Sequence, residues 1–573
     1  MQRSRAIAAV AIVFSLVTAF LPCVTRAAPL PARGRHGMVA AQQEIASKVG
    51  VAVLKLGGNA VDAAIAVGLA LAVVYPEAGN IGGGGFMLMR NANGEFHAID
   101  YRETAPKAAG QDLYIGANGE VIKGEGSSTE GYRASGIPGT LAGFELAFKK
   151  YGSGKIRWAD LVRPARLLAQ NGFELGFRLI KQFNEDKAKL EKYPESTRIF
   201  LNGGPGFTEG DTLRQPDLAK VLSRVERLGA RDFYSGETAR LIAADMKARD
   251  GLVTLADLAG YKPKERTPIH GSYRGYEVVS MSPPSSGGIV MLEVLNMLEN
   301  YDVAATKPNS ALRYHLLAET MRRGFADRAE FVGDPEFTKV PVAKLIDKAY
   351  ARSRASSIDL QHASSSSTIG HGEITVAEST DTTNYAVVDA AGNVVVNTYT
   401  LNDLYGSKVT IKGTGILMND EMDDFTSRPG VPNTFGLIQG AQNAIQPGKR
   451  PLSSMTPTIV LKKDGSFWFG LGARGGPRIT SAVIQTIVNV IDDDMDIQAA
   501  MDAPRIHHQW MPDEIRYEPG GFSPDTLSIL ASFGHAFVKK PENNASVTGV
   551  MIDEKGMRLG AVDSRAGGLA IGY

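Results

Sequence analysis

The chain has 573 residues, of which 43% are hydrophobic, a composition typical of a globular protein with a large core. Its 62 Lys and Arg residues nearly balance its 61 Asp and Glu residues, and neither sign forms a long run. This balance excludes the charge footprint of a nucleic-acid-binding protein or of one attracted to an anionic membrane.

Residues 1–27 have the pattern of a secretory signal peptide, with a basic start, an apolar run to about Leu21 and small residues before the exit. The apolar run is short for a membrane span, although an uncleaved N-terminal anchor is the alternative. Cys23 is the single cysteine, and Pro22 before it argues against a lipid anchor there. We expect an exported protein, periplasmic or secreted, without disulfides or a membrane span after processing.

The next segments predict mainly helices. The run "QEIASKVGVAVLKLGGNAVDAAIAVGLALAVVY" indicates two helices separated by Gly57–Gly58, the second apolar on all sides and therefore buried. Strands are expected after "IGGGG" and in "EFHAIDYRETAP". Helical patterns dominate from Pro138 to Arg249, and two more long helices are expected at "PPSSGGIVMLEVLNMLENYD" and "HLLAETMRRGFADRAEF".

Residues 355–380 are rich in Ser, Gly and Thr and predict an exposed loop. After this loop the pattern changes to strands, including "NYAVVD", "NVVVNTYTL" and "PTIVLKKDGSFWFGLG", with a late helix at "TSAVIQTIVNVIDD". Because helices and strands come in blocks, we expect an α+β layered sandwich rather than an alternating parallel sheet.

The segment after the loop predicts a hairpin. Residues 390–392 read as a three-residue turn, which places Thr382 opposite Thr400 and Asn402 one pleat further on the same face. Threonine pairs across strands are commonly packing features, so the register alone does not assign chemistry. An N-terminal threonine, however, carries its own base, an α-amine with a pKa of about 8. Thr382 would gain that amine if the peptide bond after Asp381 were broken.

Several other motifs favour structural roles. The glycines of "GNIGGGG" precede a strand rather than a phosphate-binding helix, and "PPSSGG" lacks the G-x-S-x-G pattern. His507 and His508 are adjacent and have no ligand set at metal-binding spacing. We therefore expect structural roles for these motifs.

Together these segments resemble the γ-glutamyltranspeptidases (glutathione hydrolases), members of the N-terminal-nucleophile hydrolase superfamily. The resemblance extends from about Gly37 to Tyr573 and rests on "GGNAVDAAIAVGLAL", "GNIGGGGFMLMR", "DYRETAP", "PPSSGG", "TTNYAVVD", "NTYTLN", "MDDF" and "RPLSSMTPT", in that order. It implies a four-layer αββα sandwich and self-cleavage between Asp381 and Thr382. The products would be a large chain of residues 28–381 and a small chain of residues 382–573, which stay together as one intertwined heterodimeric domain.

The resemblance also implies the site residues. Thr382 would be the nucleophile, Thr400 would orient it, and the backbone N–H groups of Gly475 and Gly476 would form the oxyanion hole. The residues that would bind the zwitterionic γ-glutamyl end are Arg102, Asn402, Glu421, Asp424, Ser453 and Ser454. Of these, Arg102 and the two serines would hold the α-carboxylate, and Asp424, with Glu421 and Asn402, the α-ammonium. Glutathione or another γ-glutamyl compound would acylate Thr382, and water, an amino acid or a dipeptide would accept the acyl group. This chemistry would require no metal and no organic cofactor.

Three positions depart from the family pattern. Arg474 stands where proline usually precedes the glycine pair, and Asn384 stands where histidine usually follows the two threonines. In the expected lid, Phe435 replaces a tyrosine that closes over the substrate in bacterial relatives. We expect a looser lid, with relatively more hydrolysis and a broader tolerance of acyl groups.

Two alternatives remain open at this point. A cephalosporin (glutaryl) acylase of the same superfamily would use the same nucleophile on a different acyl group, but Arg102, Asp424 and the serine pair favour a zwitterionic substrate. An uncleaved periplasmic binding protein would need none of the catalytic groups, and the presence of Thr382 and Thr400 argues against it.

Overall fold

The computed structural model of the chain describes residues 29–370, 382–428, 431, 433, 436–437 and 439–573. Residues Pro31–Tyr573 form one structural unit. The expected signal peptide (1–27), Asp381 at the expected cleavage point and the expected lid residue Phe435 lie outside the described residues. Among the residues that are described, no helix combines the length and apolar character needed to cross a bilayer.

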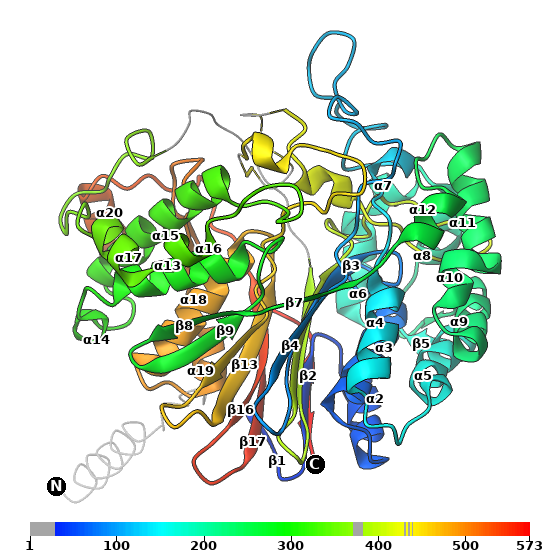
Figure 1. Cartoon of the computed structure of the whole chain (residues 1–573), viewed down its shortest axis with the longest axis horizontal. Coiled ribbons are helices and arrows are strands. Elements are labelled where there is room, and N and C mark those ends of the chain that lie inside the picture. The colour runs from blue at the N-terminus through cyan, green and yellow to red at the C-terminus, as the bar shows by residue number, and fades with distance from the viewer. Residues whose placement is uncertain (1–28, 371–381, 429–430, 432, 434–435, 438) are drawn as a thin grey trace, which may run out of the picture. The chain divides into compact units, whose positions relative to one another are not determined.

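Two seven-stranded antiparallel sheets lie face to face in the described part of this unit (Figure 1). The first sheet has the strand order β1 (Ala32–Gly34), β17 (Arg558–Val562), β16 (Ser546–Ile552), β13 (Phe467–Arg474), β12 (Thr458–Leu461), β9 (Tyr276–Ser280) and β8 (Ile269–Tyr273). The second has the order β18 (Leu569–Gly572), β2 (Met38–Ala41), β10 (Thr383–Val388), β11 (Val394–Thr400), β3 (Gly84–Arg90), β4 (Phe96–Asp100) and β7 (Lys264–Arg266). Strands β10 and β11 pack against β13, so the two sheets share a core.

Helices cover the outer face of each sheet (Figure 1). The first sheet is covered by α13 (Gly287–Leu298), α18 (Arg478–Ile491) and α19 (Ile497–Asp502), with α15 (Ala311–Phe331) and α17 (Lys348–Ala355) packed on α13. The second is covered by α2 (Glu44–Lys55), α3 (Ala60–Val74) and α4 (Thr140–Tyr151), with α5 (Trp158–Asn171) and α9 (Pro216–Leu228) behind α3. The expected four-layer αββα sandwich is therefore confirmed.

Further α-helices lie in the described part of the chain. They are α6 (Phe177–Glu185), α7 (Lys187–Leu190), α8 (Pro194–Phe200), α10 (Arg231–Ser235), α11 (Glu237–Ala248), α12 (Leu255–Gly260), α14 (Val303–Thr306), α16 (Val342–Leu345) and α20 (Pro524–Ser532). Two small ribbons pair β5 (Phe173–Glu174) with β6 (Thr212–Leu213), and β14 (Ile506–His507) with β15 (Arg516–Tyr517).

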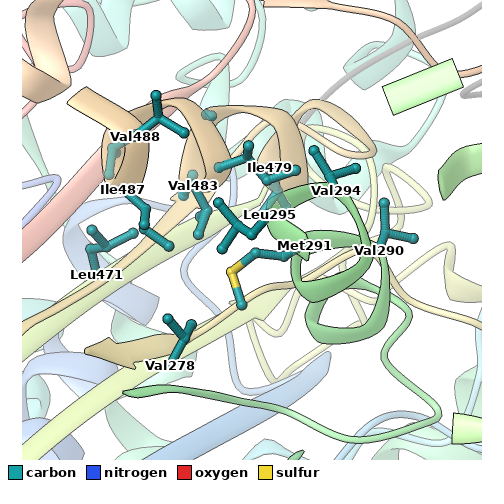
Figure 2. Close-up of a cluster of buried hydrophobic side chains, with 14 of the residues drawn as sticks. Val278, Val290, Met291, Val294, Leu295, Leu471, Ile479, Val483, Ile487 and Val488 are labelled. Atoms are coloured by element: carbon teal, nitrogen blue, oxygen red, sulfur yellow. The ribbon is translucent and has the colours of Figure 1, made fainter. Parts of the chain in front are cut away.

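The central strands are apolar on both sides because both sides are covered. On β10, Tyr385 and Val387 belong to the core beneath α2 and α3, whereas Ala386 and Val388 belong to the core shared by the sheets. Figure 2 shows the corresponding packing on the other side, where Met291 and Leu295 of α13 meet the side chains of α18 above the first sheet. Burial of each such side chain contributes about 1.5–3 kcal/mol.

The two N-terminal helices form as expected. Asn59 caps α3 because its side chain accepts hydrogen bonds from the backbone N–H groups of Val61 and Asp62. In turn, the Asp62 carboxylate accepts a hydrogen bond from the backbone N–H of Asn59. Gly57 adopts a φ of 93° between the two helices, a backbone conformation that favours glycine. Every residue of α3 is buried, which is why its sequence is apolar on all sides.

The hairpin forms in the expected register, with Val388 opposite Val394 and Thr383 opposite Tyr399. One further step in this register places Thr382, directly before β10, across from Thr400. The expectation for Asn402 is wrong in one respect: β11 ends at Thr400, and Asn402 turns away from the strand with a φ of 84°.

Candidate active site

A small cavity at one end of the two sheets collects the expected residues. Thr382, Thr400, Asn402, Arg102, Glu421, Asp424, Ser453, Ser454 and Gly476 all line it. Gly475 lines the next cavity along. Most of these side chains lie at the ends of strands: Arg102 follows β4, the two serines precede β12, and the glycine pair follows β13. The enclosed space is about 20 Å³, which holds about one water molecule, so a larger ligand requires the walls to move apart.

The two threonines are buried at the mouth of the hairpin. Thr382 is 5% exposed and Thr400 is 3% exposed. The Thr400 Oγ1 accepts a 2.8 Å hydrogen bond from the backbone N–H of Asn402, which fixes the turn that follows β11. The Asn402 side chain in turn donates to the backbone oxygen of Asp420. The turn therefore returns Asn402 to the same cavity, although the strand has ended.

The guanidinium of Arg102 is buried among carboxyl groups. Its Nη1 donates to Glu421 and its Nη2 donates to Asp424, and both contacts are ion pairs. Its Nε and Nη2 also donate to the backbone oxygens of residues 451 and 452 at 3.3 Å. Burial lowers the pKa of Arg102, but the two carboxylates outweigh burial and raise it. The expected carboxylate-binding arginine is thus committed to the protein's own carboxylates in this conformation.

The acidic side of the site includes a residue that the sequence did not indicate. Burial raises the pKa of Glu103 to about 7, although Arg102 lies 3.8 Å away and opposes the shift. Burial also raises the pKa of Glu421 well above its ordinary value, and the neighbouring charge of Glu103 adds to this effect. Because two adjacent buried carboxyls resist ionising together, this part of the site retains a proton near neutral pH.

A second guanidinium, from Arg328 on α15, lies behind the serine pair. Its Nε donates to the Ser286 Oγ at 2.8 Å and its Nη2 donates to the Ser454 Oγ at 3.3 Å. Arg328 is 2% exposed, and no described residue accepts a hydrogen bond from its Nη1 or forms an ion pair with it. Burial lowers the pKa of Arg328 to about 10, with Asp424 opposing the shift. Sequence analysis missed this residue, since "MRRGFADR" gives no sign of which arginine faces the site.

The glycine pair adopts conformations that other residues avoid. Gly475 has a φ of 132° and Gly476 a φ of 55°, directly before α18 begins at Arg478. A Cβ on Gly475 would approach Ala545 to 3.1–3.2 Å. Glycine at both positions is therefore explained by the backbone, and the turn presents main-chain N–H groups at the start of a helix.

The departures from the family pattern have different structural settings. Arg474 donates a hydrogen bond to the Tyr75 hydroxyl and lines the neighbouring cavity, not the one that contains Thr382. Asn384 is buried between the sheets, where its side chain donates to the Thr548 Oγ1 at 2.6 Å and accepts from the Thr398 Oγ1 at 2.7 Å. Asn384 thus links β10 to β16 across the core, a structural role.

The expected lid reaches the acidic group through its described residues. Asn433 donates to the Asp424 carboxylate at 3.2 Å, and Leu437 lines the cavity. The side chains of Gln439 and Asn443 both donate to the backbone oxygen of Asp424, at 3.1 and 2.6 Å. This segment therefore fixes the position of Asp424 as well as covering it.

No cluster of His, Cys, Asp and Glu side chains that could hold a metal ion is present among the residues the structure describes. The adjacent His507 and His508 are buried and serve other contacts: His507 binds the Ser481 hydroxyl, and His508 lies 3.3 Å from Asp513. The groups at the candidate site are thus hydroxyls, carboxyls, guanidiniums and backbone N–H groups, a set suited to acyl transfer on a zwitterionic substrate.

Comparison with known proteins gives consistent matches. The family model described as Gamma-glutamyltranspeptidase matches residues 46–573. The glutathione hydrolase proenzyme of Escherichia coli (strain K12) is 47% identical over 539 residues, covering 94% of this chain and 91% of that protein.

Solved structures also match. A cephalosporin acylase from Bacillus halodurans aligns with a TM-score of 0.84 at 26% identity, covering 97% of this chain and 99% of that one. A γ-glutamyltranspeptidase from Helicobacter pylori aligns with a TM-score of 0.56 at 44% identity, covering 58% of this chain and 95% of that one.

Proposed function

The chain belongs to the γ-glutamyltranspeptidase family, and from this premise we propose that it is a self-processing γ-glutamyltransferase and glutathione hydrolase. The observation that carries the proposal is the convergence of Thr382, Thr400, Gly476 and the Arg102–Asp424 pair on one cavity. Exported bacterial enzymes of this kind act outside the cytoplasm, and the N-terminal signal pattern supports the periplasm as the location.

We propose that the chain cuts itself between Asp381 and Thr382. The Escherichia coli relative is named a proenzyme, which supports processing, and the solved Helicobacter pylori chain matches only 58% of this chain. The proposed large chain (28–381) and small chain (382–573) both contribute strands to both sheets. Strand β2, for example, lies between β18 and β10, so the cut chains would remain one intertwined heterodimer.

The proposed reaction begins at the new N-terminus. The free α-amine of Thr382 takes the proton from its own hydroxyl, and the Oγ attacks the γ-carbonyl of the substrate. Negative charge develops on the carbonyl oxygen and is stabilised by the N–H groups of Gly475 and Gly476, each worth about 3–4 kcal/mol in such sites. The amide bond breaks, the amine leaves with a proton, and a γ-glutamyl ester of Thr382 remains.

The ester is then resolved by water or by an amine. Water gives glutamate and completes hydrolysis, while an amino acid or dipeptide amine gives a new γ-glutamyl compound. In both cases the proton of the attacking group returns to the Thr382 oxygen as the ester bond breaks. Thr400 lies across the hairpin from Thr382 and is suited to orient that oxygen.

We propose that the γ-glutamyl end binds by exchanging ion pairs. Its α-ammonium would form an ion pair with the Asp424 carboxylate, near Glu421 and Asn402. Its α-carboxylate would form an ion pair with Arg102 and accept hydrogen bonds from Ser453 and Ser454. This requires the Arg102–Asp424 contact to open, and it replaces one internal pair by two pairs to the ligand. A substrate with both charges offsets the free energy lost when this ion pair breaks. A glutaryl group has no ammonium, so it leaves that loss uncompensated.

Two measurements test the proposal. Intact-mass analysis with N-terminal sequencing should show a small chain that begins at Thr382. The processed protein should hydrolyse a γ-glutamyl anilide at least tenfold faster than a glutaryl anilide, since the glutaryl group leaves Asp424 unpaired. A single full-length chain would support an inactive binding protein, and a preference for the glutaryl substrate would support an acylase like the Bacillus halodurans neighbour.

A further inference from the structure

A second cavity, of about 520 Å³, lies beside the candidate site and is rich in positive charge. The charged residues that line it are Arg178, Lys181, Glu185, Arg474, Arg478 and Arg565. We refer to it as the basic cavity. The whole chain has a formal net charge of only +1, so this concentration of basic side chains is a local feature rather than a reflection of composition.

The cations of the basic cavity differ in how far the protein already uses them. Arg565 forms ion pairs with Glu518 at 2.6 Å and with Asp563 at 2.9 Å. Arg478 lies 3.5 Å from Glu542. These residues hold the wall of the cavity together, and their charges are partly neutralised by their partners.

Two basic side chains on α6 are less neutralised by neighbouring carboxylates. Arg178 donates a 3.1 Å hydrogen bond to the backbone oxygen of Arg565, and no carboxylate among the described residues pairs with it. Lys181 lies one turn later on the same helix, and its ion pair among the described residues is a 3.7 Å surface contact with Glu185. The buried carboxyl of Glu77 lies near Arg178 and Arg474, but burial raises its pKa, which weakens it as a counter-charge.

The basic cavity meets the candidate site at the glycine pair. Gly475 lines the basic cavity and Gly476 lines the site, and adjacent Cα atoms are about 3.8 Å apart. The glycine pair is the proposed oxyanion hole, so the bond that is made and broken lies at this common wall. The site itself encloses about 20 Å³, whereas the volume of the basic cavity is in the range of small-ligand sites.

We propose that the basic cavity binds the free carboxylate of the peptide or amino acid that leaves, or accepts, the γ-glutamyl group. This inference rests on the proposed function. The amine that leaves and the amine that accepts occupy the same position. Acylation of Thr382 releases a peptide amine from the γ-glutamyl donor, and transfer to the same peptide is the reverse of that step. In transfer, the acceptor nitrogen forms an amide bond with the γ-carbonyl, the ester bond to Thr382 breaks, and the nitrogen's proton goes to the Thr382 oxygen. Two extended residues span at most about 7 Å, so a dipeptide held at the glycine pair would place its carboxylate no further than that into the basic cavity.

The test compares two donors that share the γ-glutamyl group and differ only at the far end. One is γ-glutamyl-glycylglycine with a free carboxylate, and the other is its C-terminal carboxamide. The processed enzyme should prefer the acid by about tenfold in kcat/KM, as expected for a charge-assisted contact. The preference should fall to about twofold in Arg178→Gln and disappear in Arg178→Gln/Lys181→Gln, and it should weaken as salt is added.

Lys187→Gln is the matched control, because Lys187 lies on α7, forms a comparable surface pair with Glu191 at 3.5 Å and does not line the basic cavity. It should keep the full preference. This inference would be overturned if the unaltered enzyme turned over both donors without a preference, or if the preference survived the double substitution. Either outcome would leave the proposed function intact. Failure to turn over either donor would overturn the proposed function, and this inference with it.

Discussion

Arg328 is buried, and no carboxylate among the described residues forms an ion pair with it, a condition that usually costs several kcal/mol unless a ligand or a network compensates it. Its contact with the Ser454 hydroxyl gives it a route to the substrate. By donating to the serine oxygen, Arg328 leaves the serine's proton free to point into the cavity. Arg328 is therefore a positioning residue for the group proposed to bind the α-carboxylate.

Arg328→Met should raise KM for a γ-glutamyl donor about tenfold with little change in kcat, because a charge-assisted contact is lost in ground state and transition state alike. Methionine is apolar and of similar length, so the buried site should tolerate it, and the urea midpoint checks this. In a Ser454→Ala background the same substitution should change KM less than twofold, since the two residues act as a unit. An undiminished effect in that background would show that Arg328 does not act through Ser454.

At the scale of residues, the family resemblance identified the groups that line the cavity, but not Glu103, directly after Arg102, or Arg328, on a distant helix. Thr382 and Thr400 are linked by a local hairpin, and the pairing of their neighbours follows from the turn. Arg328 donates to Ser454, which is 126 positions away in the sequence, from α15, a helix that packs on α13. Such a contact depends on tertiary packing and leaves no local pattern.

At the scale of elements, the segment after Asp424 acts as both cover and support for the site. Its Asn433, Gln439 and Asn443 side chains all donate hydrogen bonds to Asp424, so a change in the expected lid should also shift the carboxylate that is proposed to bind the ammonium group. The helices, the strands and the hairpin register were predictable because their periodicity is local. The turn at Asn402 was not, since a positive φ at a non-glycine residue is set by the Thr400 and Asp420 contacts.

Phe435→Tyr should raise the ratio of transfer to hydrolysis about two- to tenfold, because a hydroxyl on the expected lid adds one hydrogen bond, worth about 0.5–1.5 kcal/mol, that helps to exclude water. The ratio is measured from the products formed with a γ-glutamyl anilide and glycylglycine. Phe435→Leu is the control, since it alters the ring without adding a hydroxyl and should lower the ratio or leave it unchanged. An unchanged ratio in the tyrosine variant would contradict the prediction.

At the scale of the whole molecule, a buried histidine network ties the segment before residue 371 to the C-terminal part of the chain. His315 bonds to His535 at 2.8 Å and to the backbone of Asp359 at 2.7 Å. Ser366 donates its backbone N–H to Asp513, which also faces Arg322 and His508. The expected exposed loop is thus anchored at Ser366, which is buried, while most of its described neighbours are exposed.

This network should make the protein sensitive to acid. Burial lowers the pKa of His508 to about 4 from 6.5, helped by the positive charge of Arg322 and opposed by Asp513 and Glu319. The folded state therefore binds fewer protons than the unfolded state between those two values, and stability falls as the pH drops from about 6.5 to 4, by about 3 kcal/mol in full. Burial lowers the pKa of His535 as well, to about 3, so it adds to the same loss.

The urea midpoint measured between pH 7 and pH 4.5 should decline for the unaltered protein and decline less steeply for His508→Gln. Exposed His362, which lies 3.2 Å from Asp359, provides the control, and His362→Gln should keep the full decline. An identical acid dependence in all three proteins would show that His508 takes up no proton on unfolding in this range.

The interleaving of strands in both sheets also fixes an order of events. Strand β2 would belong to the large chain, and its neighbours β10 and β18 to the small one; β11 and β3 are divided in the same way. Pulling the fragments apart would leave bare strand edges that recruit other chains into aggregates. Under the proposed processing, we therefore expect the polypeptide to complete its architecture while still continuous and to be cut only afterwards, so fragments synthesised separately should be poor starting material for a working enzyme.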